Sequence, residues 1–350
     1  MPCSIDNLEE YLGYVDRLIH SANKEVESYL LEKYRDSVRR VKGLARKRGK
    51  GIGRVVGYAS PLDVEVVTQL GARTPVVSAC NPALEVVRER LNVYIRISTS
   101  RFDRSFVARA TLDLKEICGR VRLRADVLLP GIAPYESVED PRVGFGDGYI
   151  YHVRAFYRYE ESRVYTFRAK GSTLEAVLFS LAGETFPLRD YRDTFPLSRD
   201  VMVFRPYIKE EEFGFIALAP YEDSVVDLGE VVVPPLLQPM EGDVKTGGNA
   251  SLRLSSNEYL LLYHAVDEHG VYYVYGALLD PQGEVLSWTR EPLLAPTPGL
   301  YSGRRPSTVF PCGAVKLGDK IVISAGVDDE IAVFYEVDEA DLWRLLEALS

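Results

Sequence analysis

The 350-residue sequence predicts an all-β protein, a five-bladed β-propeller with an N-terminal α-helical extension and a short C-terminal helix. Three observations predict this fold: a helical apolar period before residue 54, short alternating apolar runs from there to residue 338, and a repeated unit within those runs. They divide the chain into a helical arm over residues 1–54, a propeller over residues 55–338 and a terminal helix over residues 339–350.

The arm is predicted to be helical because its apolar residues recur at three- and four-residue spacing. They are Leu8, Leu12, Val15, Leu18 and Ile19, then Val26, Tyr29, Leu30, Tyr34, Val38 and Val41. Such a stripe must be buried on the main domain or on another subunit, and it leads us to expect a homo-oligomer. A basic, glycine-containing run from Arg39 to Arg54 follows. Its glycines follow a helix, where a dinucleotide loop needs a strand, and it lacks the aromatic residues of a nucleic-acid site.

Five copies of one unit, a polar or proline entry followed by two strands, fill the propeller region. The copies start at Asn81, Asp140, Asp200, Asn249 and Val309, which are 59, 60, 49 and 60 residues apart. Units of this length suit four-stranded blades that bury their faces against one another. A two-sheet sandwich is the alternative, but it does not require such regular self-similarity. The final segment, DEADLWRLLEAL, has an acidic start and a leucine-rich face, which is typical of a capped helix.

Composition argues against several classes of protein. The net charge of −9 opposes a nucleic acid as the main partner. No window approaches the length of a membrane helix and the first residues lack a leader pattern, so we expect no membrane partner and a cytoplasmic location. Four cysteines without C-x-x-C spacing predict neither a disulfide scaffold nor a metal site. Asn and Gln total nine residues, which favours a thermophilic source as a hypothesis.

Polar residues at the blade entries are candidates for one shared site, because the first strands of all blades surround one channel. The candidates are Asn81, Asp140, Arg142, Arg199, Asp200, Lys245, Asn249 and Asp329, with His264 at the end of the fourth unit's second strand. Each residue taken alone is better explained by a turn or an inter-blade salt bridge. Their convergence from different blades is what indicates a function.

Four segments resemble glycoside hydrolase family 130. They are VEDPRV around Asp140, KTGGNASL followed by YHAVD at 263–267, YGALLD ending at Asp280, and VFPCGAVKLGD from Val309. The resemblance covers the chain from about Pro75 onward. It implies a five-bladed propeller that cleaves β-mannosides with inorganic phosphate as co-substrate and without another cofactor. Helical N-terminal extensions involved in oligomerisation occur in that family.

The resemblance also implies roles for individual residues. Asp140 is the general acid, whose proton is thought to pass through a sugar hydroxyl. The implied phosphate ligands are Arg199, Lys245 and His264, together with Tyr273 or Tyr275. The implied substrate-binding residues are Asn81, Arg96, Arg142 and Asp329, and the blade-entry residues Asp200 and Asn249 join them as candidates.

One acid with three cationic or protonatable groups is the composition expected for phosphorolysis. Phosphate is already a nucleophile and needs cations to hold it, whereas an inverting hydrolase needs a second carboxylate to deprotonate water. The leading hypothesis is therefore an inverting phosphorylase that releases α-mannose 1-phosphate. A hydrolase with Glu139, Asp200 or Asp329 as its base is one alternative, and a propeller that binds sugar or protein without turnover is another.

One departure from the family pattern bears on the substrate. Members commonly have His-Arg-Pro at the end of the second strand of the third blade, and the corresponding stretch is read here as Ala217–Pro220. A cation and an imidazole are then missing, unless a neighbour such as Arg205 replaces them.

Overall fold

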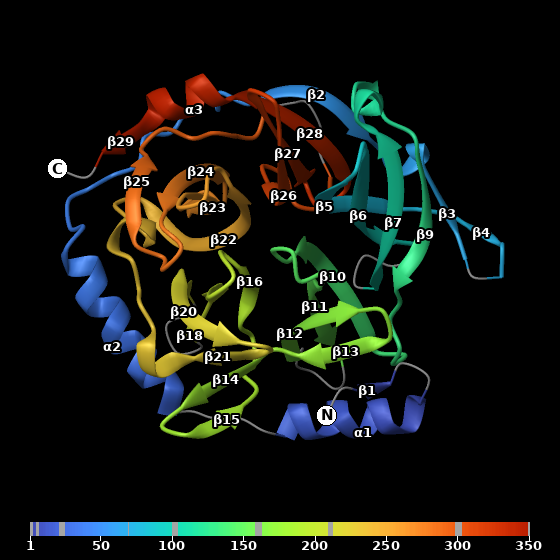
Figure 1. The fold of residues 1–350 in the computed structure, drawn as a ribbon, viewed down its shortest axis with the longest axis horizontal. Coiled ribbons are helices and arrows are strands. Elements are labelled where there is room, and N and C mark those ends of the chain that lie inside the picture. The colour runs from blue at the N-terminus through green and yellow to red at the C-terminus, as the bar shows by residue number, and fades with distance from the viewer. Residues whose placement is uncertain are drawn as a thin grey trace.

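The computed structural model describes residues 3–4, 7–20, 25–68, 70–99, 104–157, 163–208, 213–297 and 303–348. Five β-sheets stand around a common axis like the blades of a propeller, with helices only at the outside (Figure 1). The predicted five-bladed β-propeller with N-terminal helices and a short C-terminal helix is confirmed.

In each of the first three blades, four strands follow one another along the chain from the axis outward, and in blades 1 and 3 an outer pair of strands precedes them. Blade 1 contains β5 (Ser78–Val87), β6 (Arg90–Ser98), β7 (Ser105–Asp113) and β9 (Leu123–Leu129), with β3 (Val64–Val67) and β4 (Arg73–Thr74) at its edge. Blade 2 contains β10 (Glu136–Val143), β11 (Ile150–Phe156), β12 (Arg163–Lys170) and β13 (Thr173–Ala176), with β1 (Cys3–Ser4) outermost. Blade 3 contains β16 (Arg192–Pro196), β17 (Val201–Arg205), β20 (Ala217–Glu222) and β21 (Val225–Asp227), extended by β14 (Leu178–Leu181) and β15 (Glu184–Phe186).

The last two blades are completed by strands from the two ends of the chain. Blade 4 contains β22 (Asp243–Arg253), β23 (Tyr259–Asp267), β24 (Tyr272–Leu279) and β25 (Val285–Thr289), then β29 (Leu346–Ala348). Blade 5 contains β26 (Val309–Leu317), β27 (Lys320–Val327) and β28 (Ile331–Asp338), then β2 (Arg54–Ala59) and β8 (Gly119–Arg120). Because β2 pairs with β28, a strand from before blade 1 closes the ring. The small ladder β18 (Tyr207–Ile208) and β19 (Phe213–Gly214) and four 3-10 turns connect these strands. The turns are Pro61–Asp63, Leu114–Glu116, Leu228–Glu230 and Pro235–Leu237.

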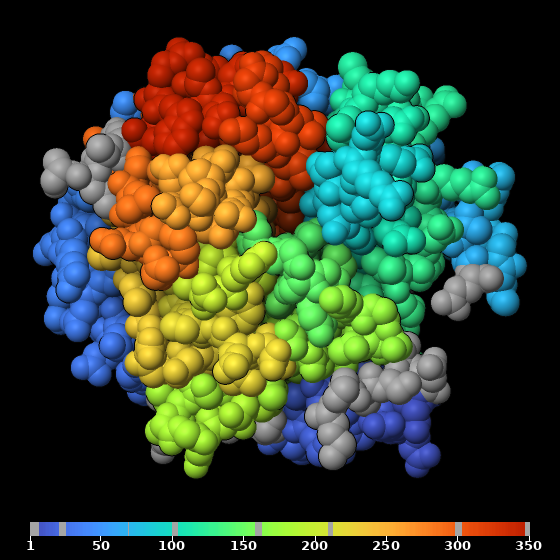
Figure 2. All heavy atoms as spheres, viewed as in Figure 1, coloured from blue at the N-terminus to red at the C-terminus, as the bar shows by residue number. Residues whose placement is uncertain are grey.

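The helical arm packs on the propeller of its own chain. Helix α1 (Leu8–His20) buries Tyr11, Val15 and Leu18 on blade 2, and α2 (Glu25–Arg39) lies along blade 3. Both lie at the outer rim (Figure 2). The hydroxyl of Ser37 donates to the carbonyl of Val233 at 2.7 Å. The stripe that suggested a partner subunit is therefore covered within the chain, and the homo-oligomer stays a prediction. Predicted arm residues 1–2, 5–6 and 21–24 lie outside the described residues.

The basic run after α2 pairs with acids of the same chain. Arg46 is buried, forms an ion pair with Asp243 and lies over the ring of Tyr263 at 5.2 Å. Lys47 and Arg54 pair with Glu291 and Glu336 at 2.8 and 2.6 Å. The glycines serve close packing: a Cβ on Gly51 would stand 2.4 Å from the carbonyl oxygen of Leu293. The basic run therefore attaches the arm to blades 4 and 5 through ion pairs and close backbone packing.

The C-terminal helix is shorter than the sequence pattern predicts. Helix α3 spans Glu339–Leu345, and the chain then extends as β29 along β25. Pairing with the open edge of blade 4 satisfies backbone groups there, and this overrides the helical period of the last leucines. Residues 349 and 350 lie outside the described residues. Across the part of the chain that the structure describes, none of the helices has the length and apolarity needed to span a bilayer.

Candidate active site

The innermost strand of every blade carries a β-bulge at the same level of the ring. The bulges contain Asn81, Asp140, Asp193, Asn249 and Cys312. At the first three the backbone is left-handed, with φ of 50°, 49° and 50°. Asn and Asp adopt this conformation more readily than other residues with a Cβ, and a bulge re-aims its side chain. Short polar side chains from blades 1, 2 and 3 are thereby turned toward the axis.

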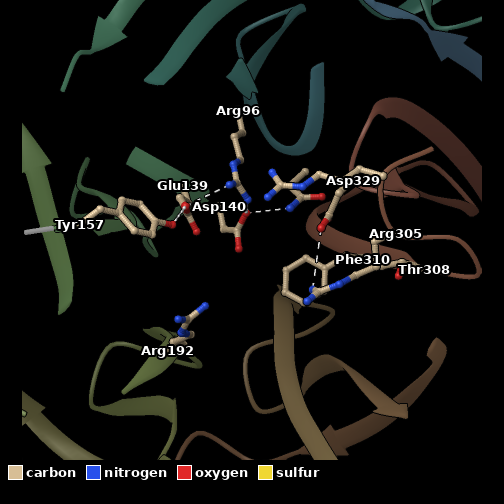
Figure 3. A pocket seen from close by; sticks show the side chains of 11 residues that line it. Arg96, Glu139, Asp140, Tyr157, Arg192, Arg305, Thr308, Phe310 and Asp329 are labelled. Carbon is tan, nitrogen blue, oxygen red and sulfur yellow. Dashed lines mark hydrogen bonds and ion pairs between the residues drawn. The ribbon is translucent and has the colours of Figure 1, made fainter. Parts of the chain in front are cut away.

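A pocket of about 260 Å³ lies at this level, next to the bulges of blades 1 and 2 (Figure 3). Its lining is rich in charge: Asn81, Arg96, Glu139, Asp140, Tyr157, Arg192, Arg304, Arg305, Thr308, Phe310 and Asp329. Figure 3 shows these side chains pointing toward one another from four blades. A concave site with convergent ionisable groups is the usual form of a catalytic centre.

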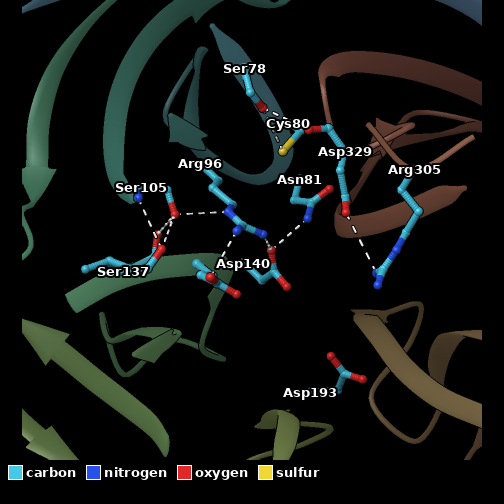
Figure 4. A network of polar contacts seen from close by, with 12 residues as sticks. Ser78, Cys80, Asn81, Arg96, Ser105, Ser137, Asp140, Asp193, Arg305 and Asp329 are labelled. Carbon is cyan, nitrogen blue, oxygen red and sulfur yellow. Dashed lines mark hydrogen bonds and ion pairs between the residues drawn. The ribbon is translucent and has the colours of Figure 1, made fainter. Parts of the chain in front are cut away.

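One oxygen of the Asp140 carboxylate is held by two donors from blade 1. Its Oδ1 accepts a hydrogen bond from Asn81 Nδ2 at 2.7 Å and lies 3.4 Å from Arg96 Nη1 (Figure 4). The other oxygen points into the pocket (Figure 3). Because the donors stabilise negative charge on Oδ1, a proton on this carboxyl group resides on Oδ2 and faces the pocket.

Two further carboxylates line the pocket, and each has an arginine beside it. Glu139 lies 3.0 Å from Arg96 Nη2, and Asp329 lies 3.8 Å from Arg305 Nη1. Burial raises the pKa of Asp329, and the charge of Asp140 adds to this effect while Arg96 and Arg305 oppose it.

A group of cations gathers beside this pocket, on blades 3, 4 and 5. Arg192 and Arg305 line it, while Arg205 and Lys245 lie close enough to His264 to influence its charge. Burial lowers the pKa of Lys245, and the positive charges of Arg205 and Arg305 lower it further. Positive charges this close together repel one another, and an anion bound among them would reduce that repulsion.

His264 is fully buried next to these cations. Its ring lies between Tyr272 and Phe310, with centroid separations of 5.2 and 5.3 Å. Burial lowers its pKa well below the usual value, and Arg205, Lys245, Arg142 and Arg305 act in the same direction. The imidazole is therefore neutral in the protein without ligand.

Most of the predicted site residues come together at the axis. Asn81, Arg96, Asp140 and Asp329 line the pocket, and Lys245 and His264 lie beside it. Arg142 and Asn249 are also axial, but they lie beneath the surface with 2% and 0% exposure.

Arg142 makes hydrogen bonds to the protein in three directions. It donates to the carbonyls of Asn249 and Asp140 and to Asp193 Oδ1, at 2.7, 3.1 and 3.0 Å. Its predicted role in binding substrate stays a prediction. It joins the innermost strands of blades 2, 3 and 4.

Arg199 and Asp200 are not part of this site. Both are exposed in the turn between β16 and β17, whereas the pocket lies at the opposite end of that hairpin, where Arg192 pairs with Arg205. Four residues of strand, roughly 13 Å, separate the two ends. These positions contradict the predictions of a phosphate ligand at Arg199 and a substrate ligand at Asp200, and Arg192 and Asp193 stand at the axial end of the hairpin instead.

The tyrosine beside the cations is Tyr272. Its ring lies 5.1 Å from Lys245 Nζ and packs on His264. Tyr273 and Tyr275 project from the other face of β24, where Tyr275 packs on Tyr263. Successive residues of a strand point to opposite faces, so an error of one position in the register misplaces the side chain.

A cation stands at the end of the second strand of the third blade. The second strand of the third blade is β17, which ends in Phe204, Arg205 and Pro206, whereas Ala217–Pro220 belong to the third strand, β20. Arg205 Nη1 lies 3.1 Å from Asp193 Oδ2. The His-Arg-Pro pattern therefore becomes Phe-Arg-Pro, and the Phe204 ring is buried against Phe179 and Tyr191.

Several site residues were not predicted as such, among them Arg192, Asp193, Arg304 and Arg305. A signal for the first two exists, because RDTFP at 192–196 has the same form as EDPRV at 139–143: charge, aspartate, bulge, strand. It was hidden because β14 and β15 precede the innermost strand of blade 3. With Asp193 in place of Asp200, the first three steps between bulges are 59, 53 and 56 residues. Among the described residues, no three His, Cys, Asp or Glu side chains gather as metal ligands.

The fold is a five-bladed propeller, and ionisable side chains gather in a pocket near its axis. Both features are typical of propeller enzymes. The model of glycoside hydrolase family 130, described as β-1,4-mannooligosaccharide phosphorylase, matches residues 45–348. The chain belongs to this family of carbohydrate-active enzymes.

Known relatives agree with this assignment. A β-1,2-mannobiose phosphorylase from Thermoanaerobacter sp. (strain X514) is 38% identical over 74 residues, which are 20% of this chain and 24% of that relative. The chain thus matches about a quarter of that relative's length. The solved β-1,2-mannobiose phosphorylase from Listeria innocua, in complex with β-1,2-mannobiose, has a TM-score of 0.62 at 18% identity, covering 82% of this chain and 96% of that one.

A third relative points to a different activity. It is a solved structure from the GH130 family of mannoside phosphorylases, which contains glycoside hydrolases that target β-1,2 mannosidic linkages in Candida mannan. Its TM-score is 0.52 at 14% identity, covering 86% of this chain and 95% of that one. At these identities the two solved structures show the fold.

Proposed function

We propose that this protein is an inverting β-mannoside phosphorylase, which transfers a mannosyl group from a β-mannoside or manno-oligosaccharide to inorganic phosphate and releases α-mannose 1-phosphate. The observation that carries the proposal is the division of the pocket. One carboxyl group with a free, inward-facing oxygen stands on blade 2, and a group of cations stands on blades 3, 4 and 5.

Asp140 supplies the proton. With Oδ1 held by Asn81 and Arg96, the acidic hydrogen on Oδ2 is directed to the glycosidic oxygen, either directly or through a sugar hydroxyl. General acid catalysis of this kind contributes about 10²–10⁴ to a rate.

The phosphate binds on the cationic side. Arg192 and Arg205 offer planar guanidinium forks that match phosphate oxygens, and Lys245 offers a point charge. A phosphate oxygen attacks the anomeric carbon from the face opposite the leaving group, so the bond from that carbon to the glycosidic oxygen breaks as the new carbon–oxygen bond forms. The leaving oxygen takes the proton of Asp140, which regains one when the products leave.

The test is a phosphate-dependent assay on β-1,2- and β-1,4-linked manno-oligosaccharides. The expected result is α-mannose 1-phosphate in equal amount to the bonds cleaved, with a rate that saturates in phosphate. Cleavage that proceeds at the same rate without phosphate would refute the proposal. Product analysis by NMR reads the anomeric configuration directly.

A hydrolase is the second candidate, because Asp329 is a second carboxylate in the same pocket. Of the three bases considered from sequence, Asp200 lies in the exposed β16–β17 turn. Glu139 lies 3.0 Å from Arg96, closer than Asp329 lies to Arg305 at 3.8 Å, which favours Asp329. Its raised pKa makes it a better base than an ordinary aspartate. Free mannose as the only product, and its loss in the Asp329→Asn variant, would favour this candidate. The reason to consider a propeller without turnover was a missing cation, and Arg205 at the end of β17 is a candidate for that cation.

A further inference from the structure

The hydrogen-bonding direction of His264 is fixed by its neighbour Asn249. The Asn249 side chain donates from Nδ2 to the carbonyl of Pro311 at 3.0 Å, and only the amide nitrogen can serve as that donor. Its Oδ1 is therefore the atom that faces His264 Nδ1 at 3.1 Å. An amide oxygen only accepts, so Nδ1 carries the hydrogen of the imidazole.

The other nitrogen of the ring, Nε2, is then a hydrogen-bond acceptor in the neutral ring. It is buried and has no partner within the part of the chain that the structure describes. Four positive groups near the ring lower its pKa and so disfavour a second proton; they are Arg205, Lys245, Arg142 and Arg305. An acceptor left unpaired beside several cations is an unusual arrangement, because such a buried atom costs stability until a donor reaches it.

A carboxylate oxygen that is already paired with an arginine lies near the same place. A Cβ on Gly247 would stand 2.9 Å from His264 Nε2 and 2.8 Å from Asp193 Oδ2, which lies 3.1 Å from Arg205 Nη1 in an ion pair. Glycine at this position keeps the strip of β22 between the two acceptors clear, and Lys245 lies on the same face two residues away. A ligand oxygen that approaches His264 Nε2 must therefore bring a hydrogen.

We propose that His264 selects a protonated anion: its Nε2 accepts the hydrogen of the P–OH group of monohydrogen phosphate, while Arg205 and Lys245 contact the charged oxygens. This inference rests on the proposed function, since it assigns the phosphate of that reaction a defined orientation. No bond to phosphorus changes in this step, and the proton stays on phosphate oxygen.

The consequence is discrimination between anions of equal charge and similar shape. Near neutral pH, phosphate and arsenate both carry an O–H group, whereas sulfate carries none. Sulfate would set an oxygen lone pair against Nε2. A site built around a ligand hydrogen bond rejects the analogue that lacks it far more strongly than size alone would.

The test is a calorimetric titration of the full-length protein with phosphate, arsenate and sulfate at one pH near neutrality and constant ionic strength. Phosphate and arsenate are expected to bind within about tenfold of each other, and sulfate on the order of 100-fold more weakly or less. Sulfate binding within tenfold of phosphate would overturn the proposal. So would the absence of any phosphate binding, which would also refute the proposed function.

Two variants locate the effect. His264→Phe keeps a ring between Tyr272 and Phe310 but removes the acceptor, so the preference for phosphate over sulfate should fall to within about tenfold. Lys245→Met is the matched control: a point charge does not distinguish the anions, so both should weaken together and the preference should stay. An unchanged preference in folded His264→Phe would overturn the proposal. Selective binding of phosphate without phosphorolysis of any mannoside would refute the proposed function and leave this inference standing.

Discussion

The Asp140→Asn variant replaces the pocket-facing oxygen of the carboxyl group by an NH2 group. It removes the proposed proton transfer and keeps the other contacts of the side chain. In Asp140→Asn the remaining Oδ1 still accepts from Asn81 and Arg96, and asparagine tolerates the left-handed backbone at φ of 49°. The bulge of β10 and the inter-blade contacts therefore remain. What disappears is the acidic hydrogen on the pocket side.

The expected loss follows from that single change. Removal of a general acid lowers kcat by about 10²–10⁴, which corresponds to about 2.7–5.4 kcal/mol of transition-state stabilisation. A nitrophenyl mannoside needs little protonation to leave, so its cleavage should suffer at least about tenfold less than that of a manno-oligosaccharide.

The assay measures initial rates with both substrates at saturating phosphate, for the wild type, Asp140→Asn and the control Asp200→Asn. The control changes an aspartate of the same type in the exposed β16–β17 turn and should leave both rates within about twofold. Retention of more than about a tenth of the activity on oligosaccharides in Asp140→Asn contradicts an acid role at this position. Equal losses on both substrates would instead place the defect in binding or folding.

Three other perturbations test the site and its surroundings. Arg205→Ala should raise the KM for phosphate about 10- to 100-fold, because a charge-assisted hydrogen bond contributes about 1.5–3 kcal/mol, while Arg199→Ala should leave KM unchanged; phosphate titrations of the initial rate compare them. Gly247→Ala places a methyl group 2.5 Å from His264 Cε1 and should lower the free energy of unfolding in urea by about 1–3 kcal/mol, and an unshifted midpoint would contradict this packing. His152 is buried and its pKa is well below the usual value, mainly through burial and then Arg154. Below about pH 6.5 the unfolded chain binds a proton at His152 and the folded chain does not. The free energy of unfolding should therefore fall by about 1.4 kcal/mol for each pH unit of acidification. Urea unfolding of His152→Gln should lack this component, and equal slopes in both proteins would argue against it.

The overall fold followed from the sequence because blades repeat and strands alternate. The entries at Asn81, Asp140 and Asn249 fell on true bulges, and at the first two the left-handed backbone favours Asn or Asp. The third entry was misplaced from Asp193 to Asp200, because β14 and β15 place an outer pair of strands ahead of the innermost one. Spacing alone cannot reveal that the chain visits the edge of a blade before its centre.

The residues of the pocket were predicted only in part. Asp140 and Arg96 line it, and Lys245 and His264 lie beside it, whereas Arg205 was named only as a possible substitute. Tyr272 was missed in favour of Tyr273 and Tyr275 because strand parity depends on a register that residue letters do not carry. The partnerless state of His264 Nε2 depends on atoms from Asn249 and Pro311, which only the folded chain brings together.

The pairing of β2 with β28 has a consequence for how the protein is made. The strand Arg54–Ala59 leaves the ribosome early and must wait for its neighbour at residues 331–338, which is among the last segments translated. Until then β2 lacks its partner in blade 5, whereas blades 2 and 3, on which the arm packs, are already translated. Nascent chains of this kind expose apolar surface and unpaired strand edges for most of synthesis, so expression yield should depend on the supply of chaperones. The yield should fall sharply when the strand at residues 331–338 is truncated.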